Sequence, residues 1–110
     1  PRVWGRPSDD RITTATAIWY TEAETGDIIL DGVSCSKGEL RLAAEVLKLA
    51  LKTIKVEADG ASVRVTTAAH QDYDLDKEHT IDDVVAFYEA AGFRLCDEQG
   101  GDSVFMERTI

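Results

Sequence analysis

Alternation of apolar and polar residues predicts two strands near the start of the chain. The segment TTATAIWYT, residues 13–21, alternates in polarity and is rich in β-branched and aromatic residues, as half-buried strands are. A second such segment, IILDGVS at residues 28–34, follows the glycine-containing turn EAETGD. The short separation predicts a β-hairpin, and Gly32 inside its second strand indicates a bulge or a close approach of another backbone.

Apolar residues at helical spacing predict a long helix over residues 37–56, KGELRLAAEVLKLALKTIKV. The stripe consists of Leu40, Ala43, Leu47, Ala50 and Ile54, and it is widened by Leu42, Val46 and Leu49. An apolar face this wide covers more than about a third of the helix circumference. We therefore expect the helix to pack on a sheet and also to meet a further element or a second subunit.

The second half of the chain predicts a strand, a helix and a closing hairpin. Residues 62–68, SVRVTTA, alternate as a strand does, and the polar residues 69–79 form a loop. Thr80 followed three residues later by Asp83 is a capping-box pattern, and it begins a helix that we expect to stop at Gly92. The segments FRLCDEQ and SVFMERT, joined by a Gly-Gly pair, complete the pattern as a hairpin.

These elements have the order β-β-α-β-α-β-β, which predicts an α/β (α+β) fold with a mixed, mostly antiparallel sheet. At 110 residues the chain is long enough for one modest core, so we expect residues 13–110 to form one domain. Residues 1–12 contain three Arg, two Pro and Trp4 and are expected to be an N-terminal arm. Trp4 either anchors a partner or folds back over the sheet.

Charge is distributed unevenly along the chain. The net charge is −9: residues 1–56 hold eight acidic and eight basic residues, whereas residues 57–110 hold thirteen acidic and four basic ones. This balance argues against nucleic-acid binding, which needs cationic side chains to displace counterions. It fits a basic protein partner, mimicry of the charge of DNA, or a soluble acidic protein without such a partner.

The apolar runs and the cysteines bear on the location of the protein. No apolar run exceeds four or five residues, which is too short to span a membrane, and the first residues lack the apolar stretch of a signal peptide. Cys35 and Cys96 have no partner at metal-ligand spacing. We expect both to be reduced, small core residues of a cytoplasmic protein.

The acidic loop at residues 69–79 has two interpretations. Asp72, Asp74 and Asp76 have the first spacings of an EF-hand calcium loop, but the sharp turn lacks its glycine and a strand precedes the loop. We therefore expect no metal site but a solvated acidic loop, which would attract a cationic substrate or partner. The two histidines that flank the loop are expected at the surface.

The element order, the run AFYEAAGFRL and a closing hairpin that ends in VFMER resemble the C-terminal half of the GNAT superfamily of N-acetyltransferases. The resemblance covers roughly residues 13–108, and its most specific part is Phe87-Tyr88-Glu89 followed by Gly92-Phe93-Arg94. In that family the tyrosine that matches Tyr88 commonly protonates the thiolate of departing coenzyme A, a task suited to a phenol with a pKa near about 10. From the residues alone, a tyrosine on the inner face of a helix is a core residue.

In the family, a glycine-rich turn before the long helix binds the pyrophosphate of acetyl-CoA through backbone N–H groups. The matching stretch here is VSCSKGELRLAA, residues 33–44. In one register Ser36, Glu39 and Arg41 replace the family's Gln/Arg, first Gly and second Gly/Ala; in a shifted register only Gly38 matches. The cofactor-binding residues that the resemblance implies are Val33, Cys35, Lys37, Gly38 and Arg41, with the strand edges near Val33 and Val63 holding the pantetheine arm.

Two functions remain open at this point. A carboxylate at Glu39 repels a pyrophosphate, which favours a GNAT-like domain that has lost its cofactor cradle and acts as a non-catalytic protein-binding or regulatory module. Its partner is then another protein or a second copy of the chain. The alternative is a minimal acetyl-CoA-dependent N-acetyltransferase in which Tyr88 is the acid and an amine of a small molecule or protein attacks the thioester directly.

Overall fold

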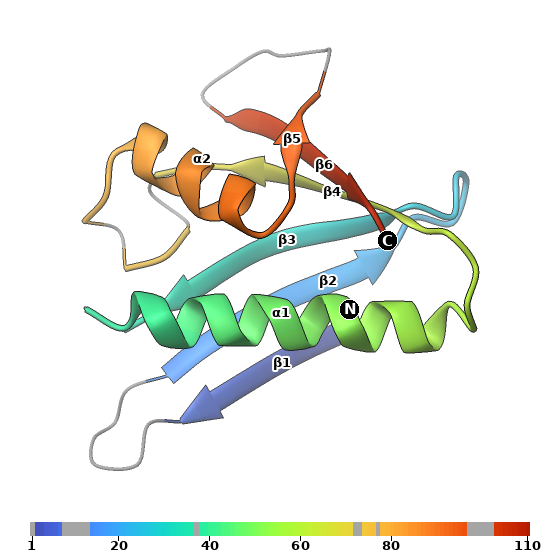
Figure 1. Cartoon of the computed structure of the whole chain (residues 1–110), viewed down its shortest axis with the longest axis horizontal. Coiled ribbons are helices and arrows are strands. Elements are labelled where there is room, and N and C mark those ends of the chain that lie inside the picture. Colours follow the sequence, from blue (N-terminus) through green and yellow to red (C-terminus); the bar gives the residue numbers. More distant parts are fainter. Residues whose placement is uncertain (1, 8–13, 37, 72–73, 77, 97–102) are drawn as a thin grey trace.

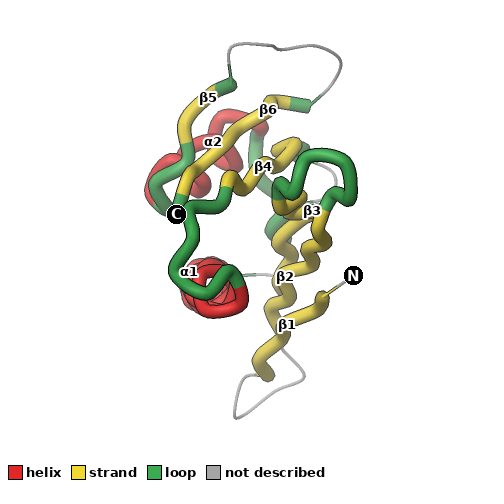
Figure 2. Tube along the Cα trace, turned by 90° about the vertical axis from the view of Figure 1, so that its right-hand side faces the viewer, coloured by secondary structure: helices red, strands yellow, loops and turns green. Residues whose placement is uncertain are grey.

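The computed structural model describes residues 2–7, 14–36, 38–71, 74–76, 78–96 and 103–110, with side chains from Ala15 onward. Its elements are β1 (Arg2–Pro7), β2 (Thr14–Thr21), β3 (Ile28–Cys35), α1 (Leu40–Glu57), β4 (Arg64–Ala69), α2 (Ile81–Ala90), β5 (Arg94–Leu95) and β6 (Val104–Thr109). The strands form one sheet of order β1-β2-β3-β4-β6-β5. Both helices cover the same face of this sheet (Figures 1 and 2).

The sheet is mixed and mostly antiparallel, as the sequence predicts. The β3–β4 pair is parallel, and the other named strand pairs are antiparallel. The predicted hairpin is confirmed as β2 and β3, with a bulge where Ile18 pairs with Gly32 and Trp19 pairs with Leu30. Asp31 is therefore the extra residue of the bulge. The closing hairpin is β5 and β6, whose predicted turn lies outside the described residues.

The prediction that residues 1–12 are an arm is wrong for Arg2–Pro7, which form the edge strand β1 and pair antiparallel with β2. Little in residues 2–7 indicates a strand, since Gly5 and Pro7 interrupt the apolar alternation. Such residues are tolerated at a sheet edge, where one row of backbone groups has no neighbouring strand. The side chain of Trp4, for which two roles were considered, lies outside the described part.

α1 is confirmed, but it begins at Leu40 rather than residue 37. Gly38 has φ +79°, in the left-handed region that cannot continue a helix. The buried residues of α1 are Ala43, Val46, Leu47, Ala50, Leu51 and Ile54, and they pack against β1, β2 and β3. The wide apolar face is thus largely covered by the sheet.

α2 has the boundaries that its sequence signals predict. The Thr80 hydroxyl accepts from the Asp83 amide, and the Asp83 carboxylate accepts from the Thr80 amide, which completes the capping box. At the other end Gly92 has φ +91°, and the amide of Phe93 donates to the Tyr88 carbonyl. This is a Schellman termination, and a Cβ at Gly92 would come within 3.1 Å of the Arg108 side chain.

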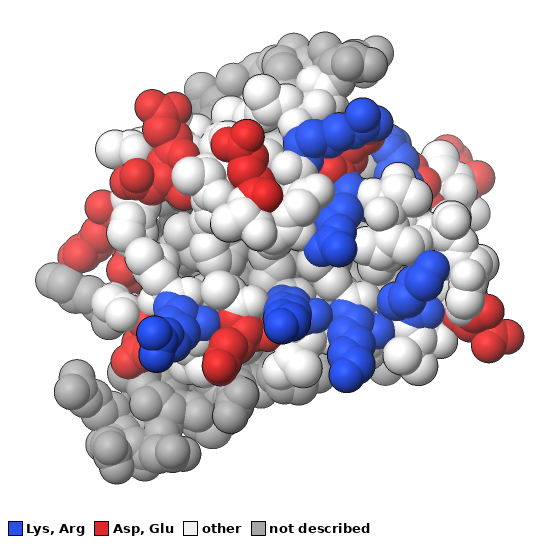
Figure 3. All heavy atoms as spheres, viewed as in Figure 1, with Lys and Arg blue, Asp and Glu red and all other residues white. Residues whose placement is uncertain are grey.

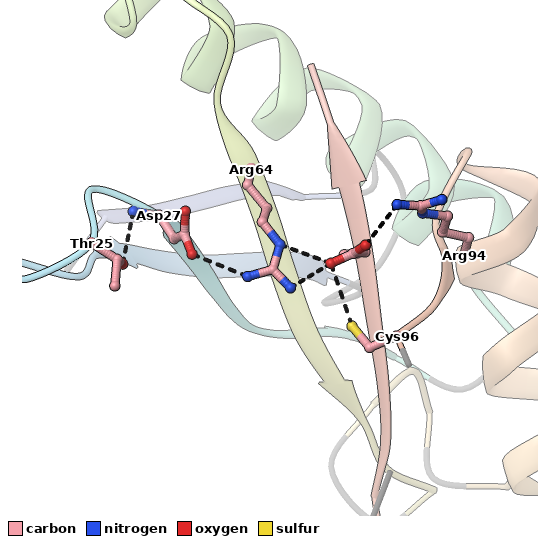
Figure 4. A network of polar contacts seen from close by, with 6 residues as sticks. Thr25, Asp27, Arg64, Arg94 and Cys96 are labelled. Atoms are coloured by element: carbon pink, nitrogen blue, oxygen red, sulfur yellow. Dashed lines mark hydrogen bonds and ion pairs between the residues drawn. The ribbon is translucent and has the colours of Figure 1, made fainter. Parts of the chain in front are cut away.

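An ionic network on the outer face of the sheet connects the residue that precedes β3 with β4, β5 and β6 (Figure 4). The Arg64 guanidinium donates to Asp27 at 3.2 Å and to Glu107, and Arg94 donates to the other Glu107 oxygen at 2.9 Å. Because Val65 and Met106 point into the core, their neighbours Arg64 and Glu107 point the opposite way. The network therefore holds together strands that are far apart in sequence.

Candidate functional site

β3 and β4 diverge after a short parallel contact. Their register runs over Ile28–Leu30 and Val65–Thr67, and beyond it β3 has a different neighbour. The Leu75 amide donates to the Val33 carbonyl at 2.7 Å, and the Cys35 amide donates to the Leu75 carbonyl at 3.1 Å. Leu75 thus acts as a one-residue strand that fills the opening between the two strands.

Leu75 holds an unusual backbone conformation to do this. Its φ is +57°, in the left-handed region that a leucine rarely adopts. Its side chain is buried in the core, and both its backbone groups are hydrogen-bonded to β3. Packing and hydrogen bonding together offset the cost of this conformation, which is about 1–3 kcal/mol.

The carboxylate of Asp74 is the polar centre of this region. Its Oδ1 accepts from the Tyr88 hydroxyl at 2.7 Å and from the Val33 amide at 3.1 Å, and its Oδ2 accepts from the His70 amide at 2.9 Å. Asp74 is 2% exposed. A buried carboxylate is tolerated only when donors replace the lost water, and here three protein groups do so.

Burial raises the pKa values of both Asp74 and Tyr88. Loss of solvent raises the pKa of Asp74 in spite of the hydrogen bonds from Tyr88, His70 and Val33. Loss of solvent, together with the nearby Asp74 carboxylate, raises the pKa of Tyr88 well above its usual value near 10. The phenol is therefore a weaker acid than a free tyrosine and already donates its proton to an internal partner.

The nearby residue Asp76 accepts a hydrogen bond from the turn that precedes α1. Its Oδ2 accepts from the Gly38 amide at 3.1 Å and its Oδ1 from the Glu78 amide at 3.1 Å, while His79 Nε2 lies 3.0 Å from Oδ1. Burial alone would raise the pKa of Asp76, but the two amides and His79 hold it below its usual range. A carboxylate of the chain itself thus lies at the N-terminus of the long helix, where anions are favoured.

The expectation of a solvated acidic loop is therefore wrong for Asp74 and Asp76. Both carboxylates accept hydrogen bonds from the fold, and the Asp76 side chain is only 5% exposed. The third residue of the calcium-like pattern, Asp72, lies outside the described residues. Within the described ranges no group of three or more His, Cys, Asp or Glu side chains is placed to hold a metal ion.

The structure brings together three of the residues that the resemblance implies for a site. Val33 and Tyr88 both donate to Asp74, and Gly38 donates its amide to the nearby Asp76. Tyr88 is fully buried, with the rings of Phe87 and Phe93 at 5.4 and 5.5 Å between centroids.

The other candidates lie apart from this centre. Arg41 is exposed on α1, and Lys37 is outside the described residues. Cys35 is half-buried, and burial, with the carboxylates of Asp76 and Glu39, raises the pKa of its thiol to about 11. A thiol that stays protonated at neutral pH is a poor nucleophile. The backbone of Val63 is hydrogen-bonded in both directions to Ile110, at 2.9 Å each.

The sequence interpretation missed the roles of Asp74 and Leu75. One signal was available: Leu75 is an aliphatic residue with an acid on each side within a polar loop, a pattern that a fully solvated loop does not require. The bonds of Asp74 to β3 and α2 join residues 41 and 14 positions apart, and no local pattern reports such a contact.

Comparison with protein-family models, curated proteins and solved structures found no match to this chain. Within the described residues, no helix has the length and apolar character needed to cross a membrane. We therefore infer a function from the geometry of the site alone.

Proposed function

We propose that this chain is a GNAT-like domain that does not bind acetyl-CoA and acts as a non-catalytic protein-binding or regulatory module. Its strand order, the parallel β3–β4 pair that diverges, and the aromatic run at the end of α2 support the likeness. The proposal that it lacks the cofactor is carried by one observation. Residues 74–76 of the chain itself occupy the backbone groups that the family offers to acetyl-CoA.

Residues 74–76 cover two parts of the expected path of the cofactor. The β3 edge at Val33, which would hold the pantetheine arm, is bonded to Asp74 and Leu75. The other expected strand edge, at Val63, precedes the parallel contact that begins at Ile28 and Val65, so it does not lie beside Val33, and its backbone is bonded to Ile110. At the start of α1 the Gly38 amide donates to Asp76, so a pyrophosphate would meet a fixed negative charge instead of a free N–H group.

The catalytic alternative requires a tyrosine that reaches the departing thiolate. Tyr88 has no solvent exposure, and its proton is held by Asp74 at 2.7 Å. Its raised pKa does not by itself prevent proton donation to a thiolate, but the buried geometry leaves the substrate no access. These observations favour the binding module over the enzyme.

Thermal unfolding with saturating acetyl-CoA tests the proposal. A ligand at 100 times its Kd stabilises the folded state by about 2.7 kcal/mol, which raises the Tm of a domain of this size by several degrees. We expect no such shift, and no release of coenzyme A with amine or peptide acceptors. An upward shift with acetyl-CoA, absent with an equal concentration of ADP, would contradict the proposal.

A further inference from the structure

A groove lies between α1 and α2 on the helical face of the protein, and its lining includes none of the residues hydrogen-bonded around Asp74. It has a volume of about 820 Å³ and is lined by residues 44–55 of α1, the end of α2 and the end of the chain. Its apolar lining consists mainly of Leu47, Leu51, Phe87, Ala90 and Ile110. The start of α1, where Asp76 binds, does not contribute to it.

The charged residues of the groove are all cationic. Lys48, Lys52, Lys55 and Arg108 line it, and no Asp or Glu does. These are four of the seven Lys and Arg side chains that the structure describes, in a chain whose net charge is −9. Figure 3 shows a row of cationic side chains along α1 and a second group across from it, with acidic side chains gathered over α2.

Two of the four cations are not engaged by the fold. Arg108 donates to the Ala91 carbonyl at 2.6 Å, and Lys55 donates to the Ala61 carbonyl at 3.2 Å. Lys48 and Lys52 have no hydrogen-bond or ion-pair partner among the described residues, and both are exposed. The fold therefore leaves two ammonium groups beside an apolar surface, where an anionic ligand would find partners for both kinds of contact.

The arrangement of the lysines indicates the shape of the ligand. Lys48, Lys52 and Lys55 follow one another at helical spacing over about 10 Å of α1, so they form a row and not a cluster around one anion. A single phosphate or carboxylate would contact only part of this row. Carboxylates four residues apart on a second helix have the same spacing as Lys48 and Lys52, and the apolar face of such a helix fits a groove of this kind.

We propose that this groove binds an acidic amphipathic helix of a partner protein. The carboxylates of the partner helix pair with Lys48, Lys52 and Lys55, and the apolar side chains of that helix contact Leu51 and Phe87. This inference rests on the proposed function, because it names the surface and the partner class of the binding module.

Fluorescence anisotropy with a model helix tests the proposal. The probe is a fluorescein-labelled peptide of about 18 residues with leucines at helical spacing flanked by glutamates. The control peptide is identical except that lysine replaces every glutamate. We expect the acidic peptide to bind and the basic one not to bind. Raising NaCl from roughly 50 to 500 mM should weaken binding about tenfold, because salt screens exposed pairs.

Two variants of equal charge locate the binding surface. Lys52→Gln and Gln71→Glu each lower the net charge by one, and both positions are exposed, so neither is expected to disturb folding. Lys52→Gln should raise the Kd of the acidic peptide about threefold or more. Gln71→Glu, which lies outside the groove, should leave this Kd unchanged. Equal effects of the two variants, or no binding of the acidic peptide, would overturn the proposal.

Other occupants of the groove give different results. A dimer that Lys52→Gln dissociates would assign the groove to a second copy of the chain and overturn the proposal. Binding of laurate at the groove without binding of the peptide would also overturn the proposal, and it would assign the groove to a small amphipathic anion. Failure of the peptide with no stabilisation by acetyl-CoA leaves the proposed function standing, whereas stabilisation by acetyl-CoA overturns that function whatever the peptide does.

Discussion

The region where β3 and β4 diverge and the groove between α1 and α2 belong to the same domain, but their polar groups are used differently. Around Asp74 the donors of Val33, His70 and Tyr88 are matched to one buried carboxylate. In the groove, Lys48 and Lys52 have no partner among the described residues. Satisfied buried polar groups stabilise a fold, whereas exposed charges beside apolar surface are available to a ligand.

Of the substitutions that test this comparison, Asp74→Ala should have the largest effect on the free energy of unfolding. The substitution leaves the amides of Val33 and His70 and the hydroxyl of Tyr88 buried without an acceptor, so we expect a loss of about 3 kcal/mol in the free energy of unfolding. Urea denaturation measures it. The control is Asp31→Ala on β3, where the aspartate is exposed and the expected change is within about 0.5 kcal/mol; equal losses would contradict the account.

Tyr88→Phe should have the next largest effect. It removes one hydrogen bond to a buried carboxylate and keeps the ring packing, so we expect destabilisation by about 2 kcal/mol. Tyr20→Phe is the matched control, because Tyr20 is 42% exposed and its hydroxyl is accessible to water. If Tyr88→Phe were as neutral as Tyr20→Phe in chemical denaturation, the Tyr88–Asp74 bond would not contribute as proposed.

The raised pKa of Asp74 predicts a pH dependence with a definite sign. The folded protein holds this proton more tightly than the unfolded chain does, so the contribution of Asp74 to stability is largest below the unfolded pKa of about 3.9 and falls as pH rises through the folded value. Asp74→Asn carries no such proton. Relative to wild type, the variant should therefore gain stability between about pH 4 and pH 7.

Unfolding free energies of both proteins at the two ends of that range measure this difference. The depressed pKa values of Asp76 and Glu107 act in the opposite direction, but both proteins retain these residues. Their contribution thus cancels in the comparison. A stability difference that is constant with pH, or that moves in favour of wild type as pH rises, would contradict the assignment.

Lys52→Gln should have the smallest effect on the fold. An exposed lysine without a described partner contributes little to stability, so we expect a change within about 0.5 kcal/mol by urea denaturation. The same substitution is expected to weaken binding of the acidic peptide. A large loss of stability would mean that the lysine row supports the fold and would remove the contrast between the two regions.

The elements were predictable from the sequence where a single local rule sufficed. Alternation identified the β2–β3 hairpin, and the apolar stripe identified α1. Thr80, Asp83 and Gly92 marked the ends of α2. β1 was missed because an edge strand tolerates Gly5 and Pro7, which interrupt the alternation on which such a prediction depends.

The candidate site was predictable only in part, for a different reason. Tyr88 and Val33 were identified through the family resemblance, but the residue that joins them was assigned to a solvated loop. Whether an aspartate is solvated or buried depends on donors from β3 and α2, and these positions are known only after the chain has folded. The groove depends likewise on how far apart α1 and α2 lie on the sheet.

Amide hydrogen exchange at Cys35 and Leu75, with and without acetyl-CoA, tests the central claim most directly. If residues 74–76 close the opening between β3 and β4, both amides should exchange as slowly as those of the core strands, since their hydrogen bonds at 3.1 and 2.7 Å open only with the fold. Acetyl-CoA should leave these rates unchanged. Exchange as fast as in the exposed turn at Ala23–Thr25, or a change in protection of these two amides when acetyl-CoA is added, would show an open site and contradict the account.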